Sequence, residues 1–273
     1  MAKTLSKRYS GVLAHPTSFP SPYGIGDFGK GAYDFINFLT GAGQSLWQIL
    51  PLGHTGYGDS PYQAFSAFAG QPLLISPDEL IKDGLLYGDD LRDYPHFNPD
   101  HIYYGDVIPA KLRILHRSYE IFKESADLCM LKEFDVFCEH EKDWLDDYAL
   151  YTEIKAANDG KSWSEWEDEY RLRDELALEK FAKENQEGIL FQKFMQYEFA
   201  TQWGALKAYA NEKGIEIIGD IPIYVAFDSA DSWSHPELFQ FDEDCNPTAV
   251  AGCPPRSRRA ISPIRTAPAV WEL

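Results

Sequence analysis

The stretch that decides the fold is residues 10–52, SGVLAHPTSFPSPYGIGDFGKGAYDFINFLTGAGQSLWQILPL. The apolar run Ser10–Ala14 breaks at His15-Pro16 into a loop rich in proline and glycine, which predicts a strand followed by a loop. A helix is predicted from Lys30, because apolar residues recur there at helical spacing. Ser45–Leu52 is apolar again and predicts a second strand. The helical positions are Ala32, Phe35, Ile36 and Leu39, closed by Gly41 and Gly43.

A strand, a helix and a strand within about forty residues form one βαβ unit, which predicts a parallel sheet. The next predicted strand is Ile215–Gly219, after a long helix that stops at Lys213-Gly214. About 165 residues separate the second and third strands, far more than one crossover helix needs. We therefore expect a large, mainly helical insertion at roughly residues 71–187. The long helix carries one apolar face, made of Phe191, Phe194, Met195, Phe199, Trp203 and Leu206.

Within the insertion, the pattern predicts one helix near Pro109–Glu124 and a second near Leu131–Asn158. The charged residues from Ser164 to Lys183 predict a solvated stretch. Trp163-Ser164-Glu165-Trp166 is most simply interpreted as a surface helix of this insertion.

The composition is that of an acidic globular protein, with a net charge of −18 and 44% hydrophobic residues. Nucleic acid is an improbable partner, because nucleic-acid binding depends on clustered Lys and Arg. No apolar run reaches membrane-spanning length, and no signal-peptide pattern follows Met1–Ser10. The four cysteines match neither zinc spacing nor a disulfide framework. We expect reduced thiols, a cytoplasmic protein, no membrane partner and no metal or organic cofactor.

Each predicted strand ends in a loop dense in polar and aromatic residues, and parallel strands bring such loops to one side of a sheet. Tyr57, Ser60 and Tyr62 lie in a loop held by glycines and Pro61. Two aromatic rings beside a hydroxyl suit sugars, whose C–H faces stack on rings while their hydroxyls need polar partners. The alternative is that these tyrosines pack in a tight turn. Asp220 ends the third strand, where it binds ligand hydroxyls or fixes its own loop.

Two further sets of residues are interpreted as structural. Asp228 and Asp231, with Trp233, are expected to cap a short helix in the Ser-Ala-Asp-Ser sequence. His15 has no serine or cysteine in a nucleophile motif nearby. The residues alone therefore indicate no catalytic group.

Together, several motifs resemble the amylomaltases, the 4-alpha-glucanotransferases of glycoside hydrolase family 77. The motifs run in order over residues 8 to 255: GVLAHPTS (11–18), PYGIGD (22–27), WQILPL (47–52), YGDSPYQ (57–63), IGDIPIYV (218–225) and VAGCPP (250–255).

The resemblance implies the N-terminal portion, residues 1–255, of a (β/α)₈ TIM barrel with its insertion between strands 2 and 3. It also implies transfer of a 1,4-alpha-glucan segment from one maltooligosaccharide to the 4-hydroxyl of another by a retaining mechanism. Ser60 and Tyr62 are then similar to residues that line the donor sugar. Tyr57 is similar to part of a secondary glucan site, and Asp220 to the aspartate of the third strand.

The resemblance ends after Pro254-Pro255. The family's nucleophile, acid/base and sugar-binding aspartate motifs occur nowhere in this sequence, so no catalytic residue is assigned and the barrel is expected to be incomplete. Residues 256–273 form a basic tail with Arg256, Arg258, Arg259 and Arg265. We interpret this tail as a frameshift product; the alternative is a genuine basic arm.

Two functional classes stay open. The first is a 4-alpha-glucanotransferase whose catalytic residues lie in sequence absent here. The second is a non-catalytic remnant that binds glucan. The chain alone is expected to be inactive. An alpha-amylase-type hydrolase is a weaker alternative, because the motifs are those of the amylomaltases.

Overall fold

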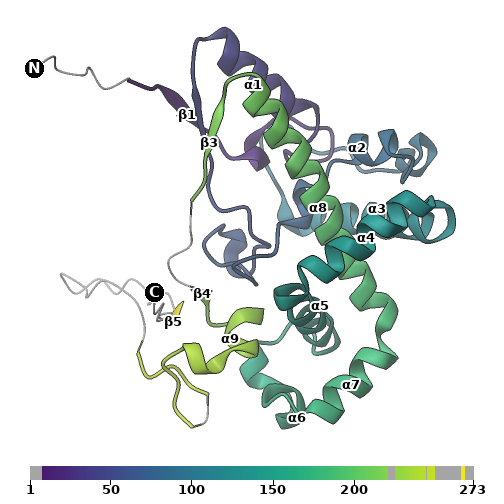
Figure 1. Cartoon of the computed structure of the whole chain (residues 1–273), viewed down its shortest axis with the longest axis vertical. Coiled ribbons are helices and arrows are strands. Elements are labelled where there is room, and N and C mark those ends of the chain that lie inside the picture. Colours follow the sequence, from purple (N-terminus) through teal and green to yellow (C-terminus); the bar gives the residue numbers. More distant parts are fainter. Residues whose placement is uncertain (1–7, 221–224, 244, 250–265, 268–273) are drawn as a thin grey trace, which may run out of the picture. The chain divides into compact units, whose positions relative to one another are not determined.

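The computed structural model describes residues 8–220, 225–243, 245–249 and 266–267 (Figure 1). Ile221–Tyr224 of the predicted third-strand loop, the 250–255 motif and the predicted tail apart from Thr266 and Ala267 lie outside these residues. The described helices are α1 (Lys30–Gly41), α2 (Pro77–Lys82), α3 (Tyr104–Ser125), α4 (Leu128–His140), α5 (Lys142–Ala157), α6 (Asp168–Arg171), α7 (Glu175–Glu184), α8 (Gln186–Glu212) and α9 (Ala230–Ser234). The described strands are β1 (Gly11–Leu13), β2 (Leu46–Gln48), β3 (Glu216–Ile218), β4 (Val225–Ala226) and β5 (Thr266–Ala267).

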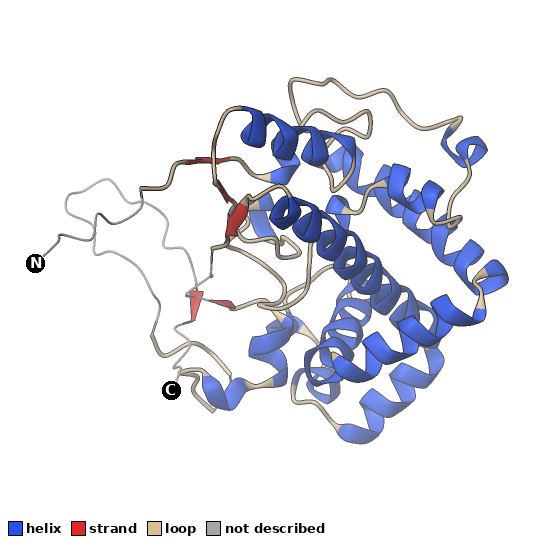
Figure 2. Ribbon diagram, turned by 45° about the horizontal axis from the view of Figure 1, so that its top comes forward, coloured by secondary structure: helices blue, strands red, loops and turns tan. Residues whose placement is uncertain are grey.

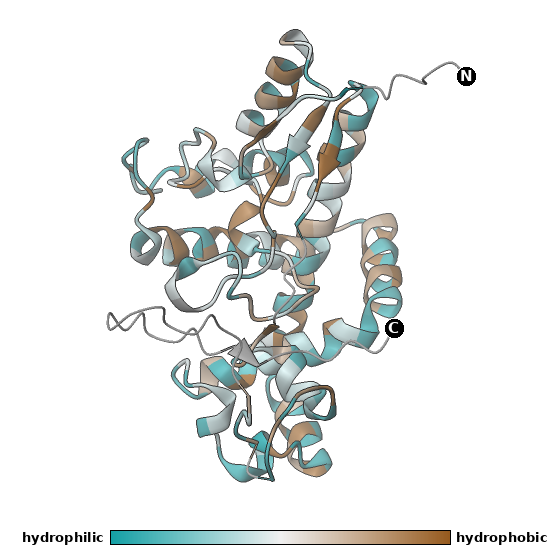
Figure 3. Ribbon diagram, turned by 90° about the vertical axis from the view of Figure 1, so that its left-hand side faces the viewer, coloured by the Kyte–Doolittle hydropathy of each residue, from teal (hydrophilic) through white to brown (hydrophobic). Residues whose placement is uncertain are grey.

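The chain folds into two compact units, and helix is far more abundant than strand in both (Figure 2). The first unit comprises residues 1–52, 72–127 and 198–220, and the second comprises residues 53–71, 128–197 and 221–273. Helices α1, α3 and α7 carry apolar and polar residues on different sides, as amphipathic helices do (Figure 3). None of the helices in the described ranges is long and apolar enough to cross a membrane.

The first unit contains the predicted parallel sheet, in the order β1-β2-β3. Val12, Trp47 and Ile217 lie opposite one another in the two parallel registers. The predictions of both strands of the βαβ unit, of α1 and of β3 are confirmed, although the strands are shorter than their apolar runs. Trp47 is fully buried with Ile36 and Leu39 of α1, and Leu206 of α8 joins the same core.

The two faces of this sheet differ in burial. Leu13, Gln48 and Ile218 share one face, because side chains alternate along a strand and these three are register partners. Leu13 is 55% exposed and Ile218 is 42% exposed. On the face that carries Trp47, helices α1 and α8 bury this residue, while Val12 on the first strand stays 36% exposed. The opposite face carries apolar side chains that the described residues leave open.

A buried ion pair holds the loop that follows β1 in the first unit. The Lys111 ammonium of α3 lies 3.0 Å from an Asp27 carboxylate oxygen and donates to the Ile75 carbonyl at 2.8 Å. The other Asp27 oxygen accepts from the Gly29 N–H. Burial raises the pKa of Asp27 and lowers that of Lys111, while each partner's charge opposes the shift of the other. The pair fixes the end of the loop where α1 begins.

The second unit corrects three sequence-based predictions. The single helix predicted near Leu131–Asn158 is two helices, α4 and α5, which are interrupted at Glu141. The stretch predicted to be solvated contains α6 and α7, and α7 buries Leu178 and Phe181. The predicted surface helix is wrong as well: Trp163 is 1% exposed and Trp166 is buried in the same core.

Two glutamines of α8 hold backbone segments that are distant in sequence. Gln196 accepts from the Gly70 N–H at 2.7 Å and donates to the Gly70 carbonyl at 3.0 Å, within the second unit. Gln202 makes the same pair of bonds to Ser76, at 2.7 and 3.4 Å, within the first unit. A side-chain amide offers one donor and one acceptor side by side, so it pairs with a peptide group as a neighbouring strand does.

Candidate functional site

The predicted sugar-binding loop is part of a closed hairpin-like segment, residues 53–71 of the second unit. Isolated antiparallel bridges join Gly53 to Gly70 and Thr55 to Ala64. The Gly56 N–H donates to the Gln63 carbonyl at 2.7 Å. A Cβ at Gly56 would lie 2.8 Å from Phe65 Cε1, so a larger residue at this position would force the Phe65 ring or the backbone to shift. The backbone of the segment is therefore fixed on both sides of its tip.

The tip carries the three residues that the sequence singled out. Tyr57 begins the short 3₁₀ turn Tyr57–Asp59, in which Gly58 and Asp59 have φ of 69° and 53°. Ser60 follows this turn, and its Oγ accepts from the Tyr62 N–H at 3.3 Å. Tyr62 is 45% exposed. The segment thus presents an accessible aromatic ring close to a serine hydroxyl that still has a proton to donate.

The base of the segment is tied to α5 through His54. His54 Nδ1 and the Tyr148 hydroxyl share a hydrogen bond of 2.6 Å. Burial lowers the pKa of His54 to about 4, so the imidazole is neutral at physiological pH. Tyr148 is fully buried, and burial raises the pKa of its hydroxyl. This neutral pair anchors the segment without placing a charge in the core.

Asp220 lies in the first unit, two residues beyond the end of β3 and half-buried. The structure therefore brings Tyr57, Ser60 and Tyr62 together in one loop and places Asp220 in the other unit. His15 follows β1, and burial lowers its pKa to about 4. Its Nδ1 atom is buried and has no hydrogen-bond partner within the described ranges.

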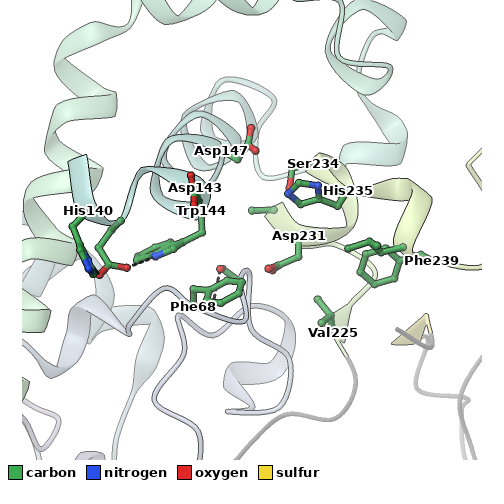
Figure 4. A pocket seen from close by; sticks show the side chains of 14 residues that line it. Phe68, His140, Asp143, Trp144, Asp147, Val225, Asp231, Ser234, His235 and Phe239 are labelled. Carbon is green, nitrogen blue, oxygen red and sulfur yellow. Dashed lines mark hydrogen bonds and ion pairs between the residues drawn. The ribbon is translucent and has the colours of Figure 1, made fainter. Parts of the chain in front are cut away.

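A cavity of about 530 Å³ opens in the second unit, beside the same segment (Figure 4). Phe68, three residues from the Gly53–Gln71 segment's end, is 61% exposed and stacks on Trp144 of α5 with 6.1 Å between ring centroids and 20° between planes. Figure 4 shows the side chains of Phe68, Trp144 and Asp231 directed toward the same space. The other lining residues are Ser66, His140, Glu141, Asp143, Asp147, Val225, Ala230, Ser234, His235, Leu238 and Phe239.

The carboxylates of this cavity differ in their partners. Glu141 accepts from the Trp144 indole N–H at 2.6 Å, which lowers its pKa. Asp147 is paired with Arg173 at 2.6 Å. Asp231 accepts from the Ala67 N–H at 3.0 Å through one oxygen, and burial raises the pKa of this carboxyl. Two of these carboxylates are thus already bound to cationic or aromatic side chains of the protein.

The cap predicted for the short helix is assigned to the wrong residues. Ser229 is the N-cap of α9, and its hydroxyl accepts from the Ser232 N–H. Asp228 instead accepts from the Tyr151 hydroxyl at 2.7 Å and pairs with Lys155 at 2.6 Å. Ser229 lies directly before the first residue of α9, so its hydroxyl caps the helix in place of an aspartate. The Asp228 carboxylate binds Tyr151 and Lys155 of α5 instead.

Sequence reasoning missed Phe68, Trp144 and His235. Phe68 follows the glycine-rich loop, but the tryptophan and the histidine come from segments far along the chain. No spacing pattern connects these segments. Among the described residues, no group of three or more His, Cys, Asp and Glu side chains is placed so that it could hold a metal ion.

Comparison with known proteins gives consistent results. A sequence profile described as 4-alpha-glucanotransferase matches residues 14–259. The chain is 44% identical over 252 residues to the 4-alpha-glucanotransferase of Synechocystis, covering 92% of this chain and 50% of that protein. It is 47% identical over 248 residues to the Thermus thermophilus enzyme of the same name, covering 91% and 49%.

Solved structures agree with these sequence matches. The amylomaltase from Streptococcus agalactiae in complex with acarbose is 38% identical and superposes with a TM-score of 0.91, over 97% of this chain and 54% of that chain. The amylomaltase from Corynebacterium glutamicum is 20% identical with a TM-score of 0.66 and supports the fold alone. The chain spans about half the length of the curated relatives it matches.

Proposed function

Because the chain belongs to the 4-alpha-glucanotransferase family, we propose that its function is the transfer of a 1,4-alpha-glucan segment from one maltooligosaccharide to the 4-hydroxyl of another. The reaction follows a retaining course, in which one carboxylate carries the glycosyl group and a second acts as acid and then as base. An acceptor sugar replaces water where the surrounding loops exclude solvent.

We assign donor binding to the tip of the 53–71 segment. The observation that carries this assignment is the fixed, glycine-dependent loop that presents Ser60 and an accessible Tyr62 ring. A sugar ring stacks on the tyrosine while its hydroxyls bond to the serine. Tyr57 adds a secondary glucan contact, and Asp220 binds sugar hydroxyls from the end of β3.

The fold that we propose for this function is the N-terminal part of a (β/α)₈ barrel, interrupted by the insertion between the second and third strands. Three parallel strands with helices on one face are the unit from which such a barrel is built. The open face with Leu13 and Ile218 supports this proposal, because inward side chains of a barrel are covered only when all strands are in place.

The catalytic carboxylates of this reaction are supplied, in our proposal, by sequence that the chain does not contain. The chain alone is then a glucan-binding body without turnover, and a non-catalytic glucan-binding protein is the second candidate. We also propose a cytoplasmic location, since the spacing of the four cysteines matches neither a zinc site nor a dense disulfide framework, which is typical of proteins from a reducing compartment.

Incubation of the purified chain with maltotriose tests the proposal. We expect binding, measured by calorimetry with maltoheptaose, and no release of glucose or of longer oligomers. The Tyr62→Ala variant is expected to bind about tenfold more weakly, since it loses one aromatic contact. Tyr87→Ala, which removes an exposed tyrosine of the other unit, is the matched control. Equal binding by both variants would remove Tyr62 from the donor site.

A further inference from the structure

The Asp231 side chain reaches from α9 to a backbone group far away in the sequence. Ser229 is the N-cap of this helix, so the aspartate is not needed there. Asp231 is the second residue of α9, and its carboxylate accepts from the Ala67 N–H at 3.0 Å. Figure 4 shows this side chain directed toward the segment that carries Phe68. The bond joins two parts of the second unit that are 164 positions apart.

A second hydrogen bond lies next to the first. The N–H of Ala230, the first residue of α9, donates to the Phe65 carbonyl at 2.7 Å. The N–H groups of a first helical turn have no partner within the helix, so they are available to neighbouring backbone. We call the two bonds, Ala230 to Phe65 and Ala67 to Asp231, the α9 clamp. Because the bonds are two residues apart on the same strand of chain, they fix its direction as well as its place.

The α9 clamp holds the limb that returns from the tip of the donor loop, residues 63–70. The Gly56 N–H donates to the Gln63 carbonyl, which joins this return limb to the other limb beside the tip. The Phe65 ring lies directly against Gly56, where a Cβ would come within 2.8 Å of Cε1. A displacement of Phe65 therefore displaces Gly56, and with it the tip.

The limb that leads to the tip has a separate anchor. His54 shares its 2.6 Å hydrogen bond with Tyr148 of α5. On the return limb, Gly70 is held by Gln196 of α8, so the α9 clamp is the attachment nearer to the tip. Since different helices hold the two limbs, the arrangement of the tip depends on where α9 holds the return limb.

The Asp231 carboxylate is well suited to this attachment. Burial raises the pKa of its carboxyl, whereas the bond from the Ala67 N–H lowers it, so this bond favours the ionised form. Hydrogen bonds to an ionised carboxylate are about twice as strong as those between neutral groups. The carboxylate is therefore the stronger kind of acceptor for a single backbone N–H.

We propose that Asp231 is a positioning residue of the donor site, because it holds the return limb through Ala67 and thereby fixes the tip. Ser60 and Tyr62 then keep the arrangement that binds a sugar. Asp231 makes no contact with the sugar and acts through the backbone. The inference rests on the proposed function, since it takes this tip as the donor site.

Amide hydrogen exchange of the ¹⁵N-labelled chain without ligand measures the effect on the tip. The Gly56 and Gln63 amides report on it, because both are hydrogen-bonded beside the tip. We expect them to exchange about tenfold faster in Asp231→Ala, which removes a hydrogen bond to a charged group. Asp231→Asn keeps an acceptor oxygen and should return the exchange close to the wild-type rate. Glu175→Ala, which removes an exposed acid from the first turn of α7, is the matched control and should change neither amide.

The same experiment distinguishes positioning from a contribution to stability alone. A contribution to stability alone would accelerate the slowest amides, which exchange through global unfolding, and would leave the local opening at Gly56 and Gln63 unchanged. That pattern would overturn the proposal.

Calorimetry with maltoheptaose links the α9 clamp to the donor site. Asp231→Ala is expected to bind more weakly, by up to about tenfold, and Asp231→Asn to bind like the wild-type chain. If Asp231 acts through the tip, Asp231→Ala/Tyr62→Ala binds no more weakly than Tyr62→Ala alone. Additive losses would show that the two residues act independently and would overturn the positioning role, as would unchanged affinity in Asp231→Ala.

The outcomes separate this inference from the proposed function. If maltoheptaose binds and Tyr62→Ala weakens the binding, while exchange at Gly56 and Gln63 stays the same in Asp231→Ala, the positioning role is refuted and the proposed function stands. Faster exchange that Asp231→Asn reverses, together with losses of affinity that are not additive, supports the positioning role. A wild-type chain that binds no maltoheptaose refutes both.

Discussion

Replacement of Glu198 by glutamine is expected to remove a pH-dependent loss of stability. Glu198 lies on α8 in the first unit, is 2% exposed, and its Oε2 makes no hydrogen bond to the residues that the structure describes. Burial, with a smaller contribution from the charge of Asp83, raises the pKa of Glu198 from 4.5 to about 8. The folded chain therefore holds a proton there that the unfolded chain releases at lower pH.

The sign and size of the effect follow from this difference in pKa. Because the folded state binds the proton more tightly, the contribution of Glu198 to stability is fully present below pH 4.5 and is lost as the pH rises to about 8. Each pH unit in this window costs about 1.4 kcal/mol, so the whole loss is about 5 kcal/mol and the loss at pH 7 is about 3 kcal/mol.

Urea unfolding of the wild-type chain and of Glu198→Gln from pH 5 to pH 8 measures this loss. Glutamine has nearly the same shape and does not titrate, so the variant's advantage in unfolding free energy is expected to grow by about 1.4 kcal/mol per pH unit. Glu212→Gln, at an exposed position of the same helix, is the control and should show no such slope. An advantage of Glu198→Gln that stays constant across this range would refute the assignment of a raised pKa.

Three other variants test individual contacts. Lys111→Met leaves the buried Asp27 carboxylate without its partner and should lower the unfolding free energy by about 3–5 kcal/mol, with recovery in Lys111→Met/Asp27→Asn. Lys30→Met breaks an exposed pair and should cost about 1 kcal/mol or less in the same urea titration, so similar losses for both lysines would contradict the burial argument. Gly56→Ala forces a Cβ against Phe65 and should weaken maltoheptaose binding in calorimetry. Gly41→Ala, whose Cβ meets open space at the end of α1, is the control and should bind maltoheptaose as the wild-type chain does. Unchanged binding by Gly56→Ala would show that the tip tolerates a shifted backbone.

The first unit could be predicted well because its signals are local. Ala32, Ile36 and Leu39 recur at helical spacing and are the residues that α1 buries. The strands that flank this helix are short apolar runs bounded by glycine and proline, and β3 has the same signature. A regular period over one element is what sequence patterns detect directly.

The second unit was less predictable because its core is assembled from distant segments. Trp163 appears exposed in sequence, beside Ser164 and Glu165, yet its indole N–H donates to the Phe227 carbonyl, which is 64 positions away. The break between α4 and α5 at Glu141 contains neither glycine nor proline. Tertiary packing decides both features, so a one-dimensional pattern does not contain them.

The same reason explains which parts of the candidate sites were found. Tyr57, Ser60 and Tyr62 lie in one loop and share a recognisable glycine frame, and their binding role stays a prediction. Trp144 and His235 join Phe68 only in the folded chain. Residues that come together only in the folded chain share no regular sequence spacing, so a sequence pattern does not identify them.

The two glutamines of α8 fix the number of residues between the two backbone segments that they bind. Gln196 pairs with Gly70 and Gln202 with Ser76, and both pairs are separated by 126 positions. Insertion or deletion of one residue between Gly70 and Ser76 would break this common offset, so one glutamine would lose its peptide partner. We therefore expect length changes to accumulate in exposed turns elsewhere in the chain, while the segment from Gly70 to Ser76 keeps its length.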